Sequence, residues 1–403
     1  MPEFRYKAVS PEGRVTQGVR EAETQGRLRE FLEMENLELV ECAIKDRSGG
    51  GRYKRLKMQT ADLANLLFQL GMQLRAGVSI VDALRAREGE EAGGVQGTVR
   101  QRLAEVVEQG TPMSEGLTQF PRIFPSYVQN VVRVAERSGT LAENLISLRA
   151  YMEWLDQNWK TFKQAMLYPM FVVVALVAFI FIALRFIFPT VVELLYELEI
   201  PLPLVTRIMI AASDFVVGYW IWILAAGFFV PIGLRILFRV SSTAAYWRDR
   251  LLISIPYLGS VIRTLAIARF LRSLILMQKA GIVITDSLRM ARDVVGNRVI
   301  EVSVIKIETA VANGSTMSSS MSKDATFPAL VRTMVGVGER SGSLDESLEA
   351  VVSYYDDLVP RKIKAFFAVL EPTLIVTTVM LAGFVAAAVF LPLVQMLSPG
   401  ALN

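Results

Sequence analysis

Charged side chains recur in a fixed pattern at two places in this sequence. The stretch ERSGTL begins at Glu136, and ERSGSL begins at Glu339, which lies 203 residues later (339 − 136 = 203). A carboxylate near the C-terminal end of a helix is opposed by the helix dipole, so helix geometry alone does not account for these glutamates. Each glutamate either pairs with a neighbouring base or faces a partner protein. Four residues are therefore candidate partner contacts: Glu136, Arg137, Glu339 and Arg340.

The composition leaves few groups for catalysis or metal binding. The chain of 403 residues has no histidine, which is the commonest general base and neutral metal ligand. Its single cysteine, Cys42, forms neither an internal disulfide nor a cysteine-rich zinc site, and it fits a reducing compartment. We find no P-loop, nucleophile elbow or zinc-ligand spacing, so we expect no enzyme activity, no cofactor and no metal. A net charge of +4 is too small to indicate nucleic acid as a partner.

The similarity between the two halves extends well beyond these six letters. The Ala-Gly pairs that begin at Ala76 and Ala280 differ by 204 positions (280 − 76 = 204). The stretches FPSYV and FPALV begin at Phe124 and Phe327, so their offset is 203 and one residue has been lost between the motifs. Motifs that keep both order and spacing indicate an internal duplication.

Local geometry explains most of the repeated letters. Gly139 and Gly342 follow a helical pattern and permit the left-handed backbone conformation in which helices often end. A Ser or Thr follows each glycine, with a Glu three residues later, which is the pattern of a capping box at the start of a helix. The predicted boxes are Thr140 with Glu143 and Ser343 with Glu346. Each repeated stretch is therefore predicted to be a corner between two helices.

A second corner is predicted in the stretch AGVSIVDAL and its repeat. Gly77 and Gly281 end one helix, and Ser79 caps the next helix in the first copy. Val283 replaces this serine in the second copy, so we expect that cap to be lost there.

The segments around these corners have helical periodicity, as in LANLLFQLGMQL and RFLRSLILMQ, which predicts two compact bundles of short helices. The N-terminal segment is predicted to form strands over residues 4–9, 15–22 and 37–45, with a helix over 24–36. Residues 46–57, DRSGGGRYKRLK, are Gly-rich and basic. They form either a solvated hinge or a docking patch for acidic lipid headgroups or an acidic protein surface.

Three long apolar segments have the length of membrane-spanning helices. Residues 165–184 and 215–234 carry no charge and are mainly apolar, and residues 372–403 carry no charge either. A helix needs about 20 apolar residues to cross the hydrocarbon core. Buried helices of soluble proteins rarely remain uncharged over that length, so three transmembrane helices are predicted.

The basic residues predict the orientation in the membrane, because Lys and Arg are enriched in cytoplasmic segments. Residues 186–214, between the first two spans, hold one base against four acids, and we expect them outside. The N-terminus has no apolar signal segment and is expected in the cytoplasm. The basic residues beside the spans are Lys160, Lys163, Arg235, Arg239, Arg248, Arg250, Arg361, Lys362 and Lys364.

The fold class expected is an all-α membrane protein with two duplicated cytoplasmic helical bundles, three transmembrane helices and a small α/β N-terminal segment. The expected boundaries are 1–45 for the N-terminal segment, 46–57 for the linker, 58–164 for the first bundle, 165–189 for the first span, 190–214 for an external loop, 215–238 for the second span, 239–371 for the second bundle, 372–397 for the third span and 398–403 for an external tail.

This set of features resembles a known family. The two AG corners, the two FP…ERSG corners, the YP and EP pairs at Tyr168 and Glu371, and three spans in this order are similar to the platform protein of type II secretion systems (general secretion pathway protein F). The type IV pilus platform proteins belong to the same superfamily. The opening FRYKAVSPEGR also resembles that family's N-terminal segment, so the resemblance covers nearly the whole chain.

The resemblance implies a scaffold in the bacterial inner membrane that is a homo-oligomer. Its implied partners are the hexameric secretion or pilus ATPase, pilin-like subunits, other inner-membrane assembly proteins and the lipid bilayer. The competing hypothesis is a subunit of an oligomeric channel or transporter, which would require polar faces along the spans. A membrane enzyme is the third class, and it lacks clustered acid–base residues.

Overall fold

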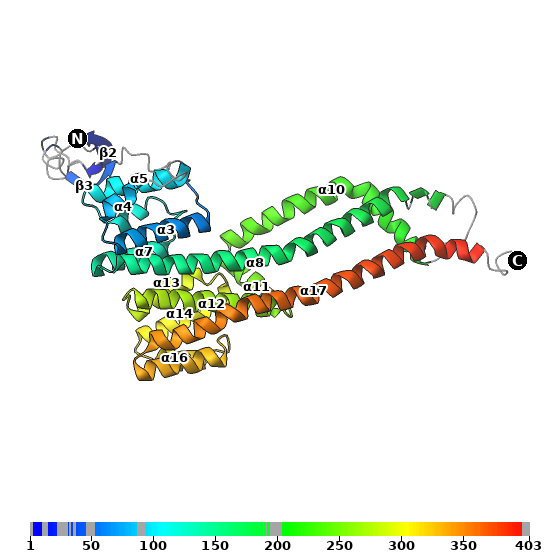
Figure 1. Ribbon diagram of the computed structural model, residues 1–403. Helices are drawn as coiled ribbons and strands as arrows, with labels where there is room; N and C mark the ends of the chain where they lie inside the picture. Colours follow the sequence, from blue (N-terminus) through cyan, green and yellow to red (C-terminus); the bar gives the residue numbers. More distant parts are fainter. Residues whose placement is uncertain are drawn as a thin grey trace. The chain divides into compact units, whose positions relative to one another are not determined.

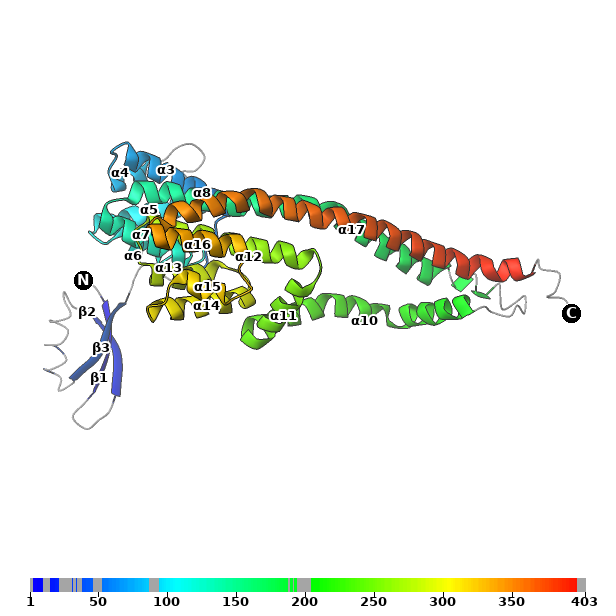
Figure 2. The ribbon, with the colours of Figure 1, turned by 90° about the horizontal axis from the view of Figure 1, so that it is seen from below.

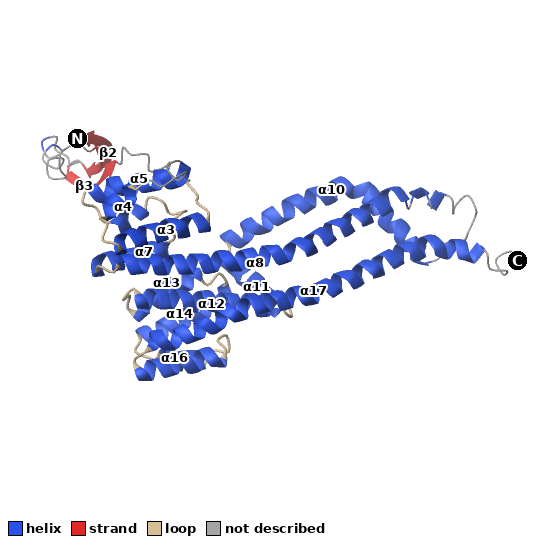
Figure 3. Ribbon diagram, in the orientation of Figure 1, coloured by secondary structure: helices blue, strands red, loops and turns tan. Residues whose placement is uncertain are grey.

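The computed structural model describes residues 3–9, 15–21, 31, 34, 38–45, 53–86, 94–187, 189–190, 192–193 and 204–396. Helices make up nearly all of this part, and the strands gather in one small sheet near the N-terminus (Figure 3). The chain divides into two compact units, Met1–Arg149 and Ala150–Asn403.

The N-terminal segment forms a three-stranded antiparallel sheet in the order β2-β1-β3. Strand β1 (Glu3–Val9) lies in the centre, between β2 (Val15–Glu21) and β3 (Glu38–Lys45). The predicted strands are confirmed. The predicted helix over residues 24–36 lies outside the described residues except at Phe31 and Met34, which are helical.

The first bundle consists of short helices that follow one another through tight corners. They are α3 (Thr60–Arg75), α4 (Ile80–Arg85), α5 (Gly94–Glu108), α6 (Met113–Leu117), α7 (Ser126–Ser138) and the first turns of α8 (Leu141–Ile182).

The second bundle repeats this series in the same order. Its helices are α12 (Leu258–Lys279), α13 (Ile284–Val294), α14 (Arg298–Ala312), α15 (Met317–Ser322), α16 (Ala329–Ser341) and the first part of α17 (Leu344–Met396). The predicted duplication is therefore present as a repeated succession of six helices.

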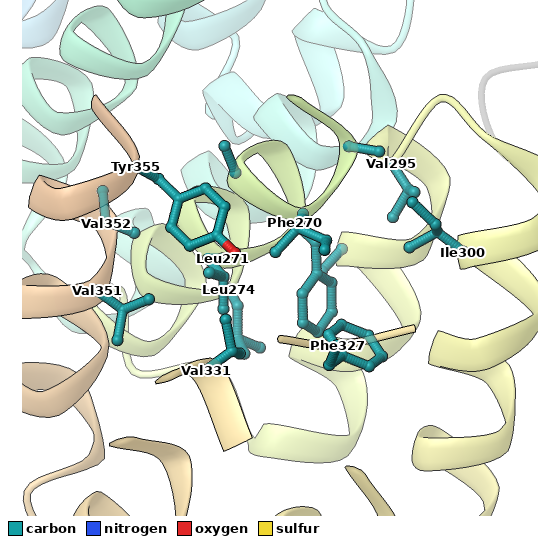
Figure 4. Close-up of a cluster of buried hydrophobic side chains, with 14 of the residues drawn as sticks. Phe270, Leu271, Leu274, Val295, Ile300, Phe327, Val331, Val351, Val352 and Tyr355 are labelled. Atoms are coloured by element: carbon teal, nitrogen blue, oxygen red, sulfur yellow. The ribbon is translucent and has the colours of Figure 1, made fainter. Parts of the chain in front are cut away.

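The two hydrophobic cores use equivalent positions of the repeat. Phe270, Leu271 and Leu274 of α12 are buried with Phe327 and Val331 in the second core (Figure 4). The positions 204 or 203 residues earlier are also fully buried in the first bundle, and they are Leu66, Leu67, Leu70, Phe124 and Val128. Residues at equivalent positions of the repeat are buried in both bundles because the two bundles have the same fold.

The apolar segments belong to three long helices. Helix α8 continues into a short π-helical segment, η2 (Ala183–Ile187), α10 covers Leu204–Val240, and α17 is 53 residues long. Within the second unit, α10 and the apolar parts of α8 and α17 extend away from the bundle (Figure 1). Only 6% of the apolar window of α17 is buried, so its apolar side chains face outward as in a lipid-exposed helix.

Several of the predicted boundaries lie inside helices of the structure. The segment 190–214 was expected as a loop, but α10 already begins at Leu204. Residues 204–214 follow two prolines and contain no helix breaker of their own, so the helix starts there. The expected limits between bundle and span, at residues 164/165 and 371/372, fall inside the unbroken helices α8 and α17.

The end of the predicted linker belongs to the first bundle. Residues 46–52 lie outside the described part of the chain. The ring of Tyr53, however, is 5.3 Å from that of the buried Phe120, and the Arg102 guanidinium lies 6.0 Å from the Tyr53 ring. Packing against another aromatic ring is more favourable for the Tyr53 side chain than exposure to water. The first bundle therefore begins at Tyr53 or earlier, and not at residue 58 as predicted.

Candidate functional site: the repeated helix corners

The two repeated glutamates bind backbone amides inside their own bundles. The Glu136 carboxylate accepts hydrogen bonds from the backbone N–H groups of Met113 (2.6 Å) and Ser114 (3.2 Å). In the second bundle the Glu339 carboxylate accepts the equivalent bonds from the N–H groups of Met317 (2.5 Å) and Ser318 (2.9 Å). Each carboxylate therefore caps the short helix that precedes its own helix in the chain.

This arrangement removes the electrostatic difficulty of an acid at a helix end. The first amides of a helix have no partner within it, and the helix dipole favours negative charge there. Pro112, at the cap position of α6, makes no side-chain cap, so Glu136 supplies the acceptor from another helix. Both predicted explanations, a basic neighbour or a partner protein, omitted this role. The glutamates are half-buried, and a contact with a partner stays a prediction.

The glycines of the repeated stretches form the expected corners. Gly139 and Gly342 both end a helix in the left-handed conformation, each with φ 71°. The amide of Thr140 donates to the Ala135 carbonyl at 2.9 Å, which is the bond that closes a helix C-terminus of this kind.

The predicted capping boxes are not what starts the next helices. In a capping box, the Glu143 carboxylate would bind the Thr140 amide, but that amide is already bound to Ala135. In the second copy the Ser343 amide donates to the Ser341 hydroxyl at 3.4 Å instead of to Glu346. The Thr140 hydroxyl lies 2.7 Å from the Ser138 hydroxyl, and Ser343 is equally close to Ser341 in the second copy. Glu143 and Glu346 are exposed. The Ser/Thr and the Glu are therefore repeated for two other reasons. The hydroxyl takes part in the turn, and a glutamate in the first turn of a helix interacts favourably with the helix dipole.

The other corner differs between the copies as expected. Gly77 and Gly281 have φ of 85° and 81°. The Ser79 hydroxyl accepts the Asp82 amide at 3.2 Å and donates to the Asp82 carboxylate at 2.6 Å. Val283 occupies the same cap position in the second copy, makes no side-chain cap and is 65% exposed.

The arginines of the repeated stretches are exposed beside two equivalent hollows. The hollow at α6 and α7 is lined by two arginines and two glutamates, and Arg137 is one of them. Among the described residues, the hollow at α15 and α16 is lined by Arg332 and Arg340 with serines and no acid. Gly336 stands in the second hollow where the first has Arg133. The two copies therefore present similar surfaces of different charge.

One acid in the loop between α15 and α16 has a pKa below its ordinary value. Burial by itself would raise the pKa of Asp324, but hydrogen bonds from Ser303 and Thr326 and the charge of Lys306 lower it below the usual range. The Thr326 amide donates to the Asp324 carboxylate at 2.8 Å, two residues before Pro328 at the start of α16. The loop between α15 and α16 is thus fixed by an ionised side chain.

Hydroxyl groups join the helices of the apolar region. The buried Thr206 hydroxyl of α10 donates to the Ala388 carbonyl of α17 at 3.0 Å, and the Ser213 hydroxyl donates to the Leu184 carbonyl at 2.7 Å. Leu184 lies in η2, and a π-helical turn alters the regular bonding of its carbonyls. Such bonds stabilise helix contacts in a membrane, where water supplies no alternative partner. Sequence reasoning missed both hydroxyls, although each interrupts an apolar run.

Within the described part of the chain, the repeated corners consist of capped helix ends beside surface hollows lined by charged side chains. No group of three His, Cys, Asp or Glu side chains there could hold a metal ion. The repeated glutamates are used to cap helices, and the exposed arginines lie on surface hollows. These features define a multi-pass membrane protein built from two copies of one helical domain, each continuous with an apolar helix.

The comparison with known families agrees with this duplication. The family model "Type II secretion system (T2SS), protein F" matches residues 66–189 and again residues 270–392, and the chain belongs to that family. Each match begins inside the first helix of one bundle, α3 or α12, and continues into the apolar helix that follows that bundle.

Relatives from both kinds of machine align with almost the whole chain. The type II secretion system protein F of Pseudomonas aeruginosa is 28% identical and covers 98% of this chain and 99% of its own length. The Vibrio cholerae protein of the same name is also 28% identical, with 98% of each chain covered. The type IV pilus assembly protein PilC of Thermus thermophilus is 29% identical, again with 98% of each chain covered.

Proposed function

We propose that this protein is the inner-membrane platform of a type II secretion or type IV pilus assembly machine. In this role it couples a cytoplasmic hexameric ATPase to the extraction and polymerisation of pilin-like subunits. The observation that carries the proposal is the repeated family match, in which each bundle leads directly into an apolar helix. An unbroken helix transmits a displacement of the bundle into the membrane region without an intervening loop.

The orientation follows from the basic residues at the span ends. Both bundles and the N-terminus lie in the cytoplasm, and the segment between α8 and α10 lies outside. This orientation brings both bundles to the side where an ATPase operates. In cells whose outer barrier has been removed, an impermeant thiol reagent should label a cysteine introduced at Glu197 and leave one at Ser343 unlabelled, in a Cys42→Ser background. The opposite pattern would overturn the orientation.

Arg137 and Arg340 are the side chains at the corners that best suit a contact with the ATPase. Both are exposed, whereas Glu136 and Glu339 are occupied with backbone amides. Arginine forms paired hydrogen bonds with carboxylates, so acidic segments of the ATPase fit these surfaces. The proposal has two further parts. The protein forms a homo-oligomer, and its exposed apolar helices contact the pilin-like subunits.

Co-purification of the full-length protein with its cognate ATPase tests this function. Arg137→Glu should weaken the complex about tenfold or more through like-charge repulsion, while Arg75→Glu, an exposed arginine at the end of α3, serves as the matched control. If the wild-type protein and the ATPase do not associate under any salt condition, the coupling role is wrong. If both variants bind like the wild type, only the location of the contact is wrong.

A further inference from the structure

Helix α11 (Ser242–Ser254) makes a sharp turn at the end of an apolar helix. Its axis is inclined by 114° to that of Ala225–Val240, the last part of α10. The Ser241 hydroxyl accepts the Ala244 amide at 3.3 Å and so caps α11 at the turn. Figure 2 shows α11 between α10 and the helices of the second bundle.

The position of this turn relative to the bilayer can be derived from the sequence of α10. The uncharged run ends at Leu234, and Arg235 and Arg239 follow before α10 ends at Val240. At about 1.5 Å per residue, the helix rises roughly 9 Å beyond the uncharged run. The headgroup layer on each side of a bilayer is roughly 5–8 Å thick. Helix α11 therefore starts at the edge of this layer, and a turn larger than a right angle inclines it back toward the bilayer.

One face of α11 is attached to the second bundle. Ala245 is buried, and Asp249 is only 3% exposed. The Asp249 carboxylate accepts the backbone amide of Arg298 at 2.8 Å, at the start of α14, and the Arg248 Nε–H at 2.8 Å. Because this buried carboxylate caps another helix, the rotation of α11 about its own axis is fixed.

The opposite face exposes large apolar side chains. Trp247 and Leu251, one helical turn apart, are 61% and 67% exposed. The Arg250 guanidinium lies 5.4 Å from the Trp247 ring. Exposure of a tryptophan and a leucine to water is unfavourable by about 25 cal/mol per Å² of apolar surface. Tryptophan and arginine next to apolar residues are typical of helices that lie in a membrane interface.

We propose that α11 is an interfacial helix whose Trp247 and Leu251 insert among the lipid headgroups, with Arg250 binding phosphate groups of acidic phospholipids. The turn at Ser241, the attachment through Asp249 and the exposed apolar face support this together. The inference adds a lipid-binding surface to the protein, and it does not depend on contact with an ATPase.

Quenching by brominated lipids tests the proposal on the full-length protein in lipid vesicles. A bimane label is placed on Leu251→Cys in a Cys42→Ser background. Val283→Cys is the control, since Val283 is exposed to a similar degree on the same bundle. Lipids brominated near the headgroup end of the acyl chain should lower the emission at position 251 about twofold relative to position 283. Bromines deeper in the chain should quench less.

Two results would overturn the proposal. In the first, the label at position 251 is reached by aqueous iodide as readily as the label at 283. In the second, it is protected from iodide but not quenched by brominated lipid, which would indicate that protein covers this face. A further arm compares vesicles of phosphatidylcholine alone with vesicles containing phosphatidylglycerol. Acidic lipid should increase the quenching, and Arg250→Gln should abolish that increase; an unchanged increase would remove Arg250 from the site.

Discussion

The Glu136 carboxylate lies 2.6 Å from the backbone nitrogen of Met113, a residue 23 positions earlier, and Glu339 holds Met317 in the same way. The contact joins α7 to the start of α6 and α16 to the start of α15. The repeated glutamate is therefore explained by the tertiary structure of each bundle.

Removal of this acceptor should destabilise the protein. Glu136→Ala leaves two amides at the start of α6 without their partner, and bonds to a charged group contribute about 1.5–3 kcal/mol. Glu136→Gln keeps one acceptor oxygen and should lose less. Unfolding in urea of the full-length protein in detergent measures the difference, with Glu143→Ala as the exposed control that should stay within about 0.5 kcal/mol. Equal stability of Glu136→Ala and wild type would mean that the cap contributes nothing.

The corner glycines should tolerate asparagine better than alanine. An added Cβ at Gly139 or Gly342 would have no atom within 4 Å, so a substitution acts through the positive φ alone. Alanine in this conformation costs about 1–2 kcal/mol, and asparagine less. Gly336→Ala, within helix α16 and without positive φ, is the matched control and should be neutral or slightly stabilising. Thermal melts of the alanine and asparagine variants at both corners and of Gly336→Ala are the measurement, and identical melting of Gly139→Ala and Gly139→Asn would contradict the turn geometry.

A missing cap in the second copy can be restored. Val283 has the extended backbone of a cap residue, with φ −57° and ψ 143°, and its side chain is exposed. Val283→Ser should therefore raise the stability by about 0.5–1 kcal/mol, and the reciprocal Ser79→Val should lower it by a similar amount. Denaturant titration of both variants compares them directly. A loss of stability in Val283→Ser would show that the valine contributes more by packing than a cap would.

The loop between α15 and α16 should lose stability in acid. Because the pKa of Asp324 is lowered in the folded state, its contribution is fully present above the unfolded value of about 4 and is lost as the pH falls through the folded pKa. Asp324→Asn should be less stable than the wild type near neutral pH, and the two should converge below about pH 4. Melting temperatures from pH 7 downward provide the comparison. A difference that stays constant with pH would exclude the charge as its cause.

Reversal of Arg137 should affect partner binding while the fold stays intact. The side chain is exposed, so Arg137→Glu is expected to change stability by no more than about 0.5 kcal/mol. Glu136→Arg is unsuitable for the same purpose, because it also removes the cap on α6. Circular dichroism and urea unfolding of the full-length variant establish whether the two effects are separable. A large loss of stability in Arg137→Glu would place this residue among the structural contacts of the corner.

The sequence alone determined the features that depend on short stretches of chain. The glycine corners, the loss of the cap at Val283 and the apolar helices follow from residues within a few turns of one another, where spacing and backbone preference decide the structure. The duplication was visible because the same short motifs recur in the same order about 203 residues apart. The three N-terminal strands were predictable for the same reason.

Only the tertiary structure decided what depends on distant segments meeting. The role of Glu136 requires α7 to pack beside α6, and the position of Tyr53 requires the buried Phe120. The first capping box did not form because the Thr140 amide was already bound across the turn, and in the second copy the Ser343 amide bonds to the Ser341 hydroxyl. The direction of α11 likewise depends on Asp249 reaching the start of α14. Side-chain hydrogen bonds between segments far apart in the chain leave no periodic pattern in the sequence, so packing decides them.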